Sequence, residues 1–217
     1  MPPVVSVVGK SKSGKTTLIE KLVKELKSRG YRVATIKHIP QEVNFDEPGK
    51  DSWRHVQAGS EATAISSPGK IVVVKPVAQE ATLDELASVI GEDYDIILTE
   101  GFKQGNAPKI EVHQRDTGPT LKDLKKLIAV VTDESLETKA RQFSPQDIGA
   151  LADLLERGFI KPQAERISLY VNNTPITLTM FPKQIISNVI LAMASCLKGV
   201  GAIRSLDICL RRGQEDK

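Results

Sequence analysis

The residues best suited to chemistry form a loop rich in glycine and lysine near the N-terminus. Residues 9–16 read Gly-Lys-Ser-Lys-Ser-Gly-Lys-Thr, which matches the phosphate-binding pattern Gly-x4-Gly-Lys-Ser/Thr at every fixed position. Gly9 and Gly14 let the backbone turn sharply and approach phosphate oxygens, and the amides of residues 11–16 point inwards at a helix N-terminus. The spacing therefore predicts a P-loop that holds a nucleoside triphosphate and Mg²⁺.

The side chains of this loop have different expected roles. We expect Lys15 to act as a catalytic cation against the β- and γ-phosphates, and the Thr16 hydroxyl to bind Mg²⁺ as a hard oxygen ligand. The residues predicted to hold the nucleotide here are Gly9, Ser11, Lys12, Ser13, Gly14, Lys15, Thr16 and Thr17. Lys10 has two interpretations: a solvent-exposed side chain, which we favour, or a lysine that reaches a partner's phosphate across a dimer.

A carboxylate that could position the Mg²⁺ ion follows a second strand. In the strand expected at 94–99, four apolar or β-branched residues, 96–99, directly precede Glu100, and Gly101 then opens a loop. Ligands of open α/β sheets gather at the carboxyl ends of the strands, so Glu100 is predicted to position Mg²⁺ or its bound water and to be the second catalytic residue. The alternative is an ordinary surface carboxylate at a strand end.

The elements that must position these residues follow an α/β pattern. An apolar strand at 4–8, an amphipathic helix at 16–29 and a strand at 32–39 make a right-handed crossover. Further strands are expected at 62–66, 71–75, 94–99, 109–113 and 127–132, and helices at 52–58, 82–90 and 144–157. This alternation predicts a P-loop NTPase-type α/β fold, with a mostly parallel sheet flanked by helices, over residues 1–162.

The pattern changes in residues 163–217. Segments 167–171 and 176–180 flank an Asn-Asn-Thr-Pro turn, 181–197 is helical in pattern, and 202–211 could return as a strand. We therefore predict a small C-terminal α+β appendix with the order β-β-α-β. Its apolar residues between 185 and 193 suit either a local core or a groove for a partner.

Composition restricts the other classes of function. The net charge of +3 suits an anionic small molecule and does not indicate nucleic acid. Two cysteines, Cys196 and Cys209, suggest neither disulfides nor a zinc site. No signal peptide is visible and the longest apolar run is far short of a membrane span, so we expect a cytoplasmic protein that does not bind membranes.

Several segments together resemble the molybdopterin-guanine dinucleotide biosynthesis protein B (MobB) family. Besides the P-loop they are Val-Ala-Thr-Ile-Lys-His at 33–38, Asp-Glu-Pro-Gly-Lys-Asp-Ser-Trp-Arg-His at 46–55, Thr-Glu-Gly-Phe-Lys at 99–103 and Pro-Lys-Ile-Glu-Val at 108–112. The resemblance covers about residues 3–160. It implies a homodimeric GTP-binding protein with weak GTPase activity at best. Such a protein works beside the nucleotidyltransferase that attaches GMP to molybdopterin, forming molybdopterin guanine dinucleotide.

Other polar residues are compatible with that role. Lys37, His38 and Arg54 could bind GTP or a phosphate-bearing pterin, although a histidine at a loop start is equally often a surface residue. Asp51 could coordinate water on Mg²⁺, as a third metal-side residue, or cap the short helix beside it. The usual Asn-Lys-x-Asp guanine reader is absent; Asp133, after the strand at 127–132, could accept hydrogen bonds from guanine or could form a turn.

Three other classes of function stay open at this level. A metallochaperone-type GTPase for nickel enzymes should carry a Cys/His cluster on the P-loop domain, and both cysteines lie outside it. An ATP-dependent small-molecule kinase should have an arginine-rich lid and an acceptor-side base, and no lid segment stands out. In a non-catalytic interaction protein, the appendix would carry the function. If the chain has the function that the MobB resemblance implies, we expect the appendix to dock the transferase or to extend the dimer interface.

Overall fold

The structure is a computed structural model that describes residues 1–41, 43, 45–163, 167–172, 174–176, 178–203 and 205–210. The chain divides into two compact units, Met1–Ala164 and Glu165–Lys217, which are described separately below.

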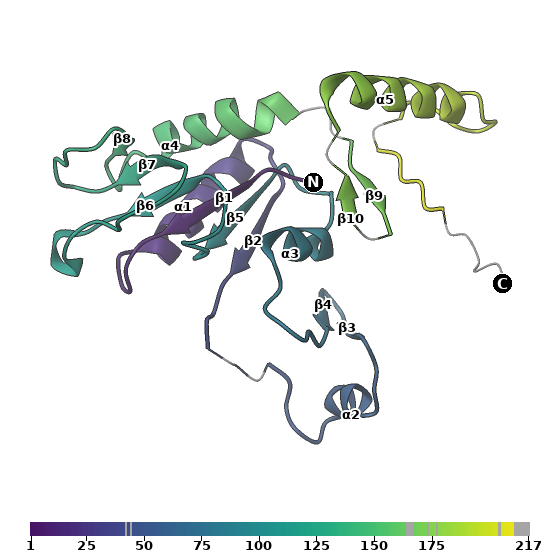
Figure 1. The fold of residues 1–217 in the computed structure, drawn as a ribbon, viewed down its shortest axis with the longest axis horizontal. Coiled ribbons are helices and arrows are strands. Elements are labelled where there is room, and N and C mark those ends of the chain that lie inside the picture. The colour runs from purple at the N-terminus through teal and green to yellow at the C-terminus, as the bar shows by residue number, and fades with distance from the viewer. Residues whose placement is uncertain are drawn as a thin grey trace. The chain divides into compact units, whose positions relative to one another are not determined.

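The first unit is built on a parallel sheet (Figure 1). Its strand order is β2-β5-β1-β6-β7-β8, and every neighbouring pair runs parallel. The strands are β1 Val4–Val8, β2 Val33–Lys37, β5 Ile96–Glu100, β6 Lys109–Val112, β7 Leu127–Val131 and β8 Arg141–Phe143. The central strands are buried, as their β-branched sequences require. The predicted α/β fold with a mostly parallel sheet is therefore confirmed.

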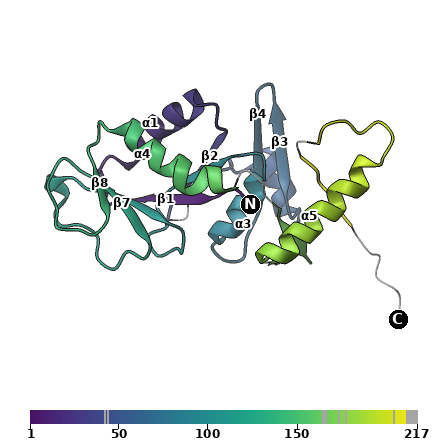
Figure 2. The same ribbon diagram turned by 90° about the horizontal axis from the view of Figure 1, so that it is seen from above.

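Helices cover both faces of the sheet. Figure 2 shows α1 (Lys15–Ser28) and α4 (Ile148–Leu155) on one side of the strands and α3 (Leu83–Ile90) on the other. Leu18, Leu22 and Leu26 of α1 are spaced one turn apart and are all buried in the larger core cluster. Helix α3 begins with the predicted capping box, in which Thr82 and Glu85 satisfy each other's backbone amides.

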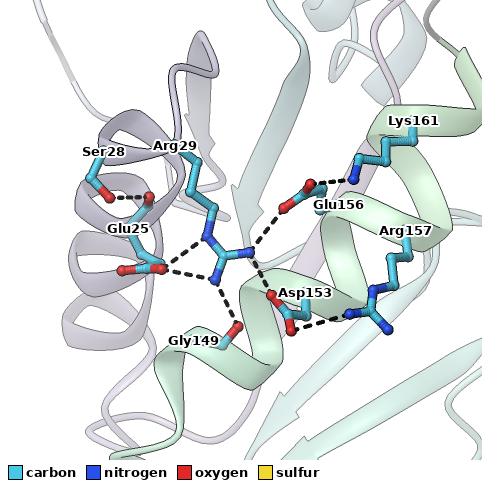
Figure 3. Close-up of polar contacts among 8 residues, drawn as sticks. All are labelled: Glu25, Ser28, Arg29, Gly149, Asp153, Glu156, Arg157 and Lys161. Atoms are coloured by element: carbon cyan, nitrogen blue, oxygen red, sulfur yellow. Dashed lines mark hydrogen bonds and ion pairs between the residues drawn. The ribbon is translucent and has the colours of Figure 1, made fainter.

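Arg29, directly after α1, ties that helix to α4 (Figure 3). Its guanidinium donates to Asp153 at 2.6 Å, to Glu156 at 2.9 Å and to the Gly149 carbonyl at 3.0 Å, and it also pairs with Glu25. The ammonium of Lys161 and the guanidinium of Arg29 lower the pKa of Glu156 to about 2. The network fixes the C-terminal end of α1 against α4, the neighbouring helix on the same face of the sheet.

The remaining elements of this unit lie around the sheet. Helix α2 (Asp51–Gln57) precedes the antiparallel hairpin of β3 (Thr63–Ser67) and β4 (Lys70–Val74), whose connection is Pro68-Gly69. The short helical turns are η1 Arg115–Thr117, η2 Glu156–Ile160 and η3 Lys161–Gln163. Most hairpin residues are exposed.

One boundary and one strand differ from the prediction. The helix expected from residue 144 begins at Ile148, because Ser144 and Asp147 close a turn first: the Asp147 amide donates to the Ser144 carbonyl, and its carboxylate accepts from the Ser144 amide. Strand β8 was not predicted, since only three residues form it and two of them are exposed.

The second unit contains a hairpin and a helix. Strands β9 (Leu169–Val171) and β10 (Thr174–Ile176) pair antiparallel, and α5 spans Met180–Ser195. The strand predicted at 202–211 is wrong for the residues that are described, 202, 203 and 205–210; positions 204 and 211 lie outside them. Leu206, Ile208 and Leu210 alternate with other residues as in a strand, but their side chains are exposed. The alternating pattern alone was therefore not enough to form a strand. Within the described ranges, no helix is long and apolar enough to cross a membrane.

Candidate functional site: a phosphate loop at the carboxyl edge of the sheet

The loop between β1 and α1 forms a tight cradle. Gly9 has φ 154°, and a Cβ at this position would lie 2.5 Å from both the Ser13 hydroxyl and the Val112 carbonyl oxygen. Ser13 is fully buried beside it. Gly14, at φ 91°, is the N-cap of α1 and offers no side chain to the first amides of the helix. Those amides are the donors that an anion binds at a helix N-terminus, so the cradle fits a phosphate group.

Lys15, Thr16 and Glu100 come together at this cradle. The Lys15 ammonium donates to the Lys10 carbonyl at 2.5 Å, and the Thr16 hydroxyl donates to Glu100 Oε2 at 2.9 Å. Glu100 reaches this position because β5 pairs with β1 in the register Val7↔Glu100. Burial lowers the pKa of Lys15; Glu100 opposes this shift, and the nearby charges of Lys103 and Lys37 add to it. A hydroxyl and a carboxylate at this edge are the hard oxygen ligands that suit Mg²⁺.

Lys37 also reaches the site, whereas His38 is engaged elsewhere. Lys37 is the register partner of Glu100, and its Nζ lies 3.9 Å from Glu100 Oε1. The His38 ring packs on Phe102 with centroids 4.7 Å apart, and its Nε2 pairs with Glu80. The described contacts of His38 therefore support the loop after β5 and do not join it to the phosphate cradle.

Asp51 and Arg54 lie on α2, and no described contact links them to the cradle. They form an exposed ion pair with each other at 3.6 Å. The N-cap of α2 is Lys50, without a side-chain cap bond, so the alternative in which Asp51 caps this helix is wrong. Among the residues that the structure describes, no group of three or more His, Cys, Asp or Glu could hold a metal ion.

The segments after β6 and β7 follow the strands on the side of β1 that faces away from β5. Asp133 is exposed just beyond β7. Its neighbour Glu134 accepts from Arg115 Nε at 2.5 Å and pairs with the buried His113 at 3.0 Å, and these contacts, Arg115 first, lower the pKa of Glu134. Lys10, for which we favoured a solvent-exposed side chain, is half-buried, with its Nζ beside Gly118.

The sequence analysis did not predict that the polar side chains of β6 and of the residue after it are buried. Lys109, Glu111 and His113 are all buried, on the face opposite Ile110 and Val112. Polar residues alternating with apolar ones in a strand between two buried strands were the available signal. The side-chain nitrogen of Gln114, the next residue, lies 3.5 Å from where a Cβ on Gly14 would be. The end of β6 is therefore in contact range of the P-loop.

A parallel sheet whose first strand ends in this cradle, beside a strand that ends in Glu100, defines the P-loop class of α/β proteins. The chain belongs to the MobB family: the family model described as "Molybdopterin guanine dinucleotide synthesis protein B" matches residues 4–133.

Individual relatives agree with this assignment. The molybdopterin-guanine dinucleotide biosynthesis adapter protein of Haemophilus influenzae is 35% identical over 156 residues, covering 71% of this chain and 88% of that protein. The adapter protein of Escherichia coli is 33% identical over 161 residues, covering 71% and 92%. The crystal structure of Bacillus subtilis MobB superposes with a TM-score of 0.55 at 28% identity, covering 72% of this chain and 98% of that one.

Proposed function

We propose that this protein is a GTP-binding adapter in the formation of molybdopterin guanine dinucleotide. The observation that carries the proposal is the hydrogen bond between Thr16 and Glu100 at the mouth of the Gly9 cradle, in a chain of the MobB family. Family membership supplies the biosynthetic context, and the site supplies a place for a triphosphate and a divalent cation.

Different residues of the cradle would bind the phosphates of GTP and the Mg²⁺ ion. The backbone amides of residues 11–16 and the Lys15 ammonium would hold the phosphates, with Thr17 beside the α-phosphate. Thr16 and Glu100 would hold Mg²⁺, which supplies charge neutralisation on the phosphate oxygens. Asp133, exposed after β7, is the proposed acceptor for the hydrogen-bond donors of guanine.

Holding GTP, with weak hydrolysis at most, is the proposed role. The cation folded over the loop is Lys15, and the nearby Arg115 is engaged by Glu134. Efficient P-loop GTPases use an arginine that stabilises charge on the transferring phosphoryl group, and no contact among the described residues brings an arginine to the cradle.

The partners in this proposal are the nucleotidyltransferase of molybdopterin guanylylation, molybdopterin or its guanine dinucleotide, and a second copy of the chain, in the cytoplasm. Asp51 and Arg54, exposed on α2, would meet a ligand or partner there, with His38 in support. Residues 163–217 are proposed to form a separate unit that docks the transferase or extends the dimer interface.

Isothermal titration calorimetry with GTP and ATP, each with and without Mg²⁺, tests the proposal. We expect GTP to bind more tightly than ATP, and Mg²⁺ to strengthen GTP binding. Lys15→Ala should weaken both nucleotides, while Lys24→Ala, at an exposed position on α1, should change neither. A clear preference for ATP, or unchanged GTP affinity in Lys15→Ala, would refute the proposal.

A further inference from the structure

Glu134 lies where two neighbouring strands of the sheet end. It comes three residues after β7, and His113 directly follows β6, which pairs with β7 in the register Val112↔Val131. His113 continues this pairing, because its amide donates to the Val131 carbonyl at 2.9 Å. The ends of the two strands therefore bring Glu134 within reach of both His113 and Arg115.

Both oxygens of the Glu134 carboxylate are engaged. Oε2 pairs with His113 Nε2 at 3.0 Å, and Oε1 accepts from Arg115 Nε at 2.5 Å. The His113 side chain is 6% exposed and the Arg115 side chain is 85% exposed, so the carboxylate joins a buried ring to a guanidinium on the surface. A carboxylate held at both oxygens by such bonds has little freedom to rotate.

The backbone beside Glu134 is held as well. The Glu134 amide donates to the Thr132 hydroxyl at 3.2 Å, and Thr132 is itself buried. The Thr132 amide donates to the Phe143 carbonyl of β8 at 2.9 Å. Hydrogen bonds made by both of its neighbours therefore hold the backbone of Asp133 in place.

The Asp133 side chain, in contrast, is exposed. Among the described residues, its carboxylate has no hydrogen-bond or ion-pair partner. An acceptor with a fixed backbone and unused oxygens is pre-organised for a ligand, because little conformational freedom remains to be lost on binding.

This network lies next to the P-loop. Gln114, between His113 and Arg115, has its side-chain nitrogen 3.5 Å from where a Cβ on Gly14 would be. Lys10 Nζ lies 3.1 Å from where a Cβ on Gly118 would be. The segment after β6 therefore borders both the phosphate cradle and Glu134, which suits a ligand with phosphates at one end and a base at the other.

We infer that Glu134 is a positioning residue for the recognition of guanine. Held by His113 and Arg115, it fixes the residue before it, so that the Asp133 carboxylate accepts from both N1–H and the exocyclic amine of guanine. Two such bonds form together only when the carboxylate is aligned with the edge of the base. The inference rests on the proposed function, in which Asp133 is the acceptor for guanine, and it adds the residue that makes this acceptor selective.

Isothermal titration calorimetry with GTP and inosine triphosphate (ITP), which lacks the exocyclic amine, tests the inference. Wild-type protein should bind GTP about tenfold or more tightly than ITP, because ITP cannot make one hydrogen bond to a charged acceptor. Asp133→Ala should abolish this difference. Glu134→Ala should lower the GTP-to-ITP affinity ratio at least about threefold. Glu137→Ala, which removes an exposed carboxylate from the same segment, should leave the ratio unchanged.

The affinity ratio separates positioning from a general structural effect, since a loosened site would weaken the binding of both nucleotides together. Arg115→Ala removes one of the two donors to Glu134 at an exposed position, and it should lower the ratio in the same direction. This variant decides the question if Glu134→Ala does not fold.

The outcomes distinguish the inference from the proposed function. If Asp133→Ala loses the discrimination while Glu134→Ala, or Arg115→Ala in its place, keeps the wild-type ratio, the inference is wrong and the proposed function stands. If wild-type protein binds no nucleotide or does not discriminate GTP from ITP, or if Asp133→Ala keeps the discrimination, the proposed role of Asp133 fails and the inference falls with it.

Discussion

Replacing Gly9 with alanine tests whether the cradle depends on the close approach of two backbone segments. The new Cβ would lie 2.5 Å from the Val112 carbonyl oxygen, which belongs to the backbone of β6 and cannot rotate away. Ordinary contact needs at least about 3.3 Å, so one strand must move by nearly 1 Å relative to the loop. Overpacking of this kind costs about 1–3 kcal/mol, and the unfavourable φ adds about 1–2 kcal/mol.

Gly30→Ala separates the two contributions. Gly30 has a positive φ of 89°, and a Cβ there would meet nothing within 4 Å, so this variant carries backbone strain alone, about 1–2 kcal/mol. By urea denaturation we expect Gly9→Ala to lose about 2–5 kcal/mol, clearly more than Gly30→Ala. GTP affinity should fall by about 100-fold or more in Gly9→Ala only. Equal stability losses in the two variants would refute the steric reasoning.

Three further predictions follow from individual contacts. Glu156 has a pKa of about 2 in place of 4.5, so its stabilising contribution is complete above about pH 4.5 and is lost as the pH falls towards 2. In urea unfolding, the difference in stability between wild type and Glu156→Gln should therefore shrink over that pH range. A difference that stays constant would contradict the prediction. Thr16→Val removes the hydroxyl beside Glu100, so Mg²⁺ should no longer strengthen GTP binding in titrations, while GTP affinity without Mg²⁺ stays within about threefold; a retained Mg²⁺ effect would count against the metal role. Lys109→Met removes the buried ammonium that donates to the Gly105 and Ala107 carbonyls, so we expect a loss of about 2 kcal/mol and faster amide hydrogen exchange over residues 102–105. Unchanged exchange there would show that Lys109 does not hold the turn after β5 in place.

Much of the site could be predicted from local sequence. The P-loop spacing, the apolar run that ends in Glu100 and the capping box of α3 are each written within ten residues or fewer, and the structure shows the cradle, the strand end and the cap where they were expected. Local signals suffice here because a turn, a strand end and a cap depend mainly on neighbouring residues.

Side-chain partners distant in the sequence could not be predicted in this way. His38 was a candidate for binding phosphate or for an ordinary surface position; the structure shows that it contacts Glu80 and Phe102, and neither contact has a trace in the residues around His38. The strand expected at 202–211 shows the same limitation. Its alternation is correct for a strand, but a strand also needs a neighbour to receive its hydrogen bonds.

The sequence by itself determined that a phosphate-binding loop follows the first strand, that a carboxylate ends another strand, and that the MobB motifs accompany them. Only the tertiary structure decided that β5 lies between β2 and β1, in the register that joins Glu100 to both Thr16 and Lys37. The physical reason is that strand order and register depend on which apolar faces α1 and α3 cover together. That choice is made by the whole core and by no single segment of the chain.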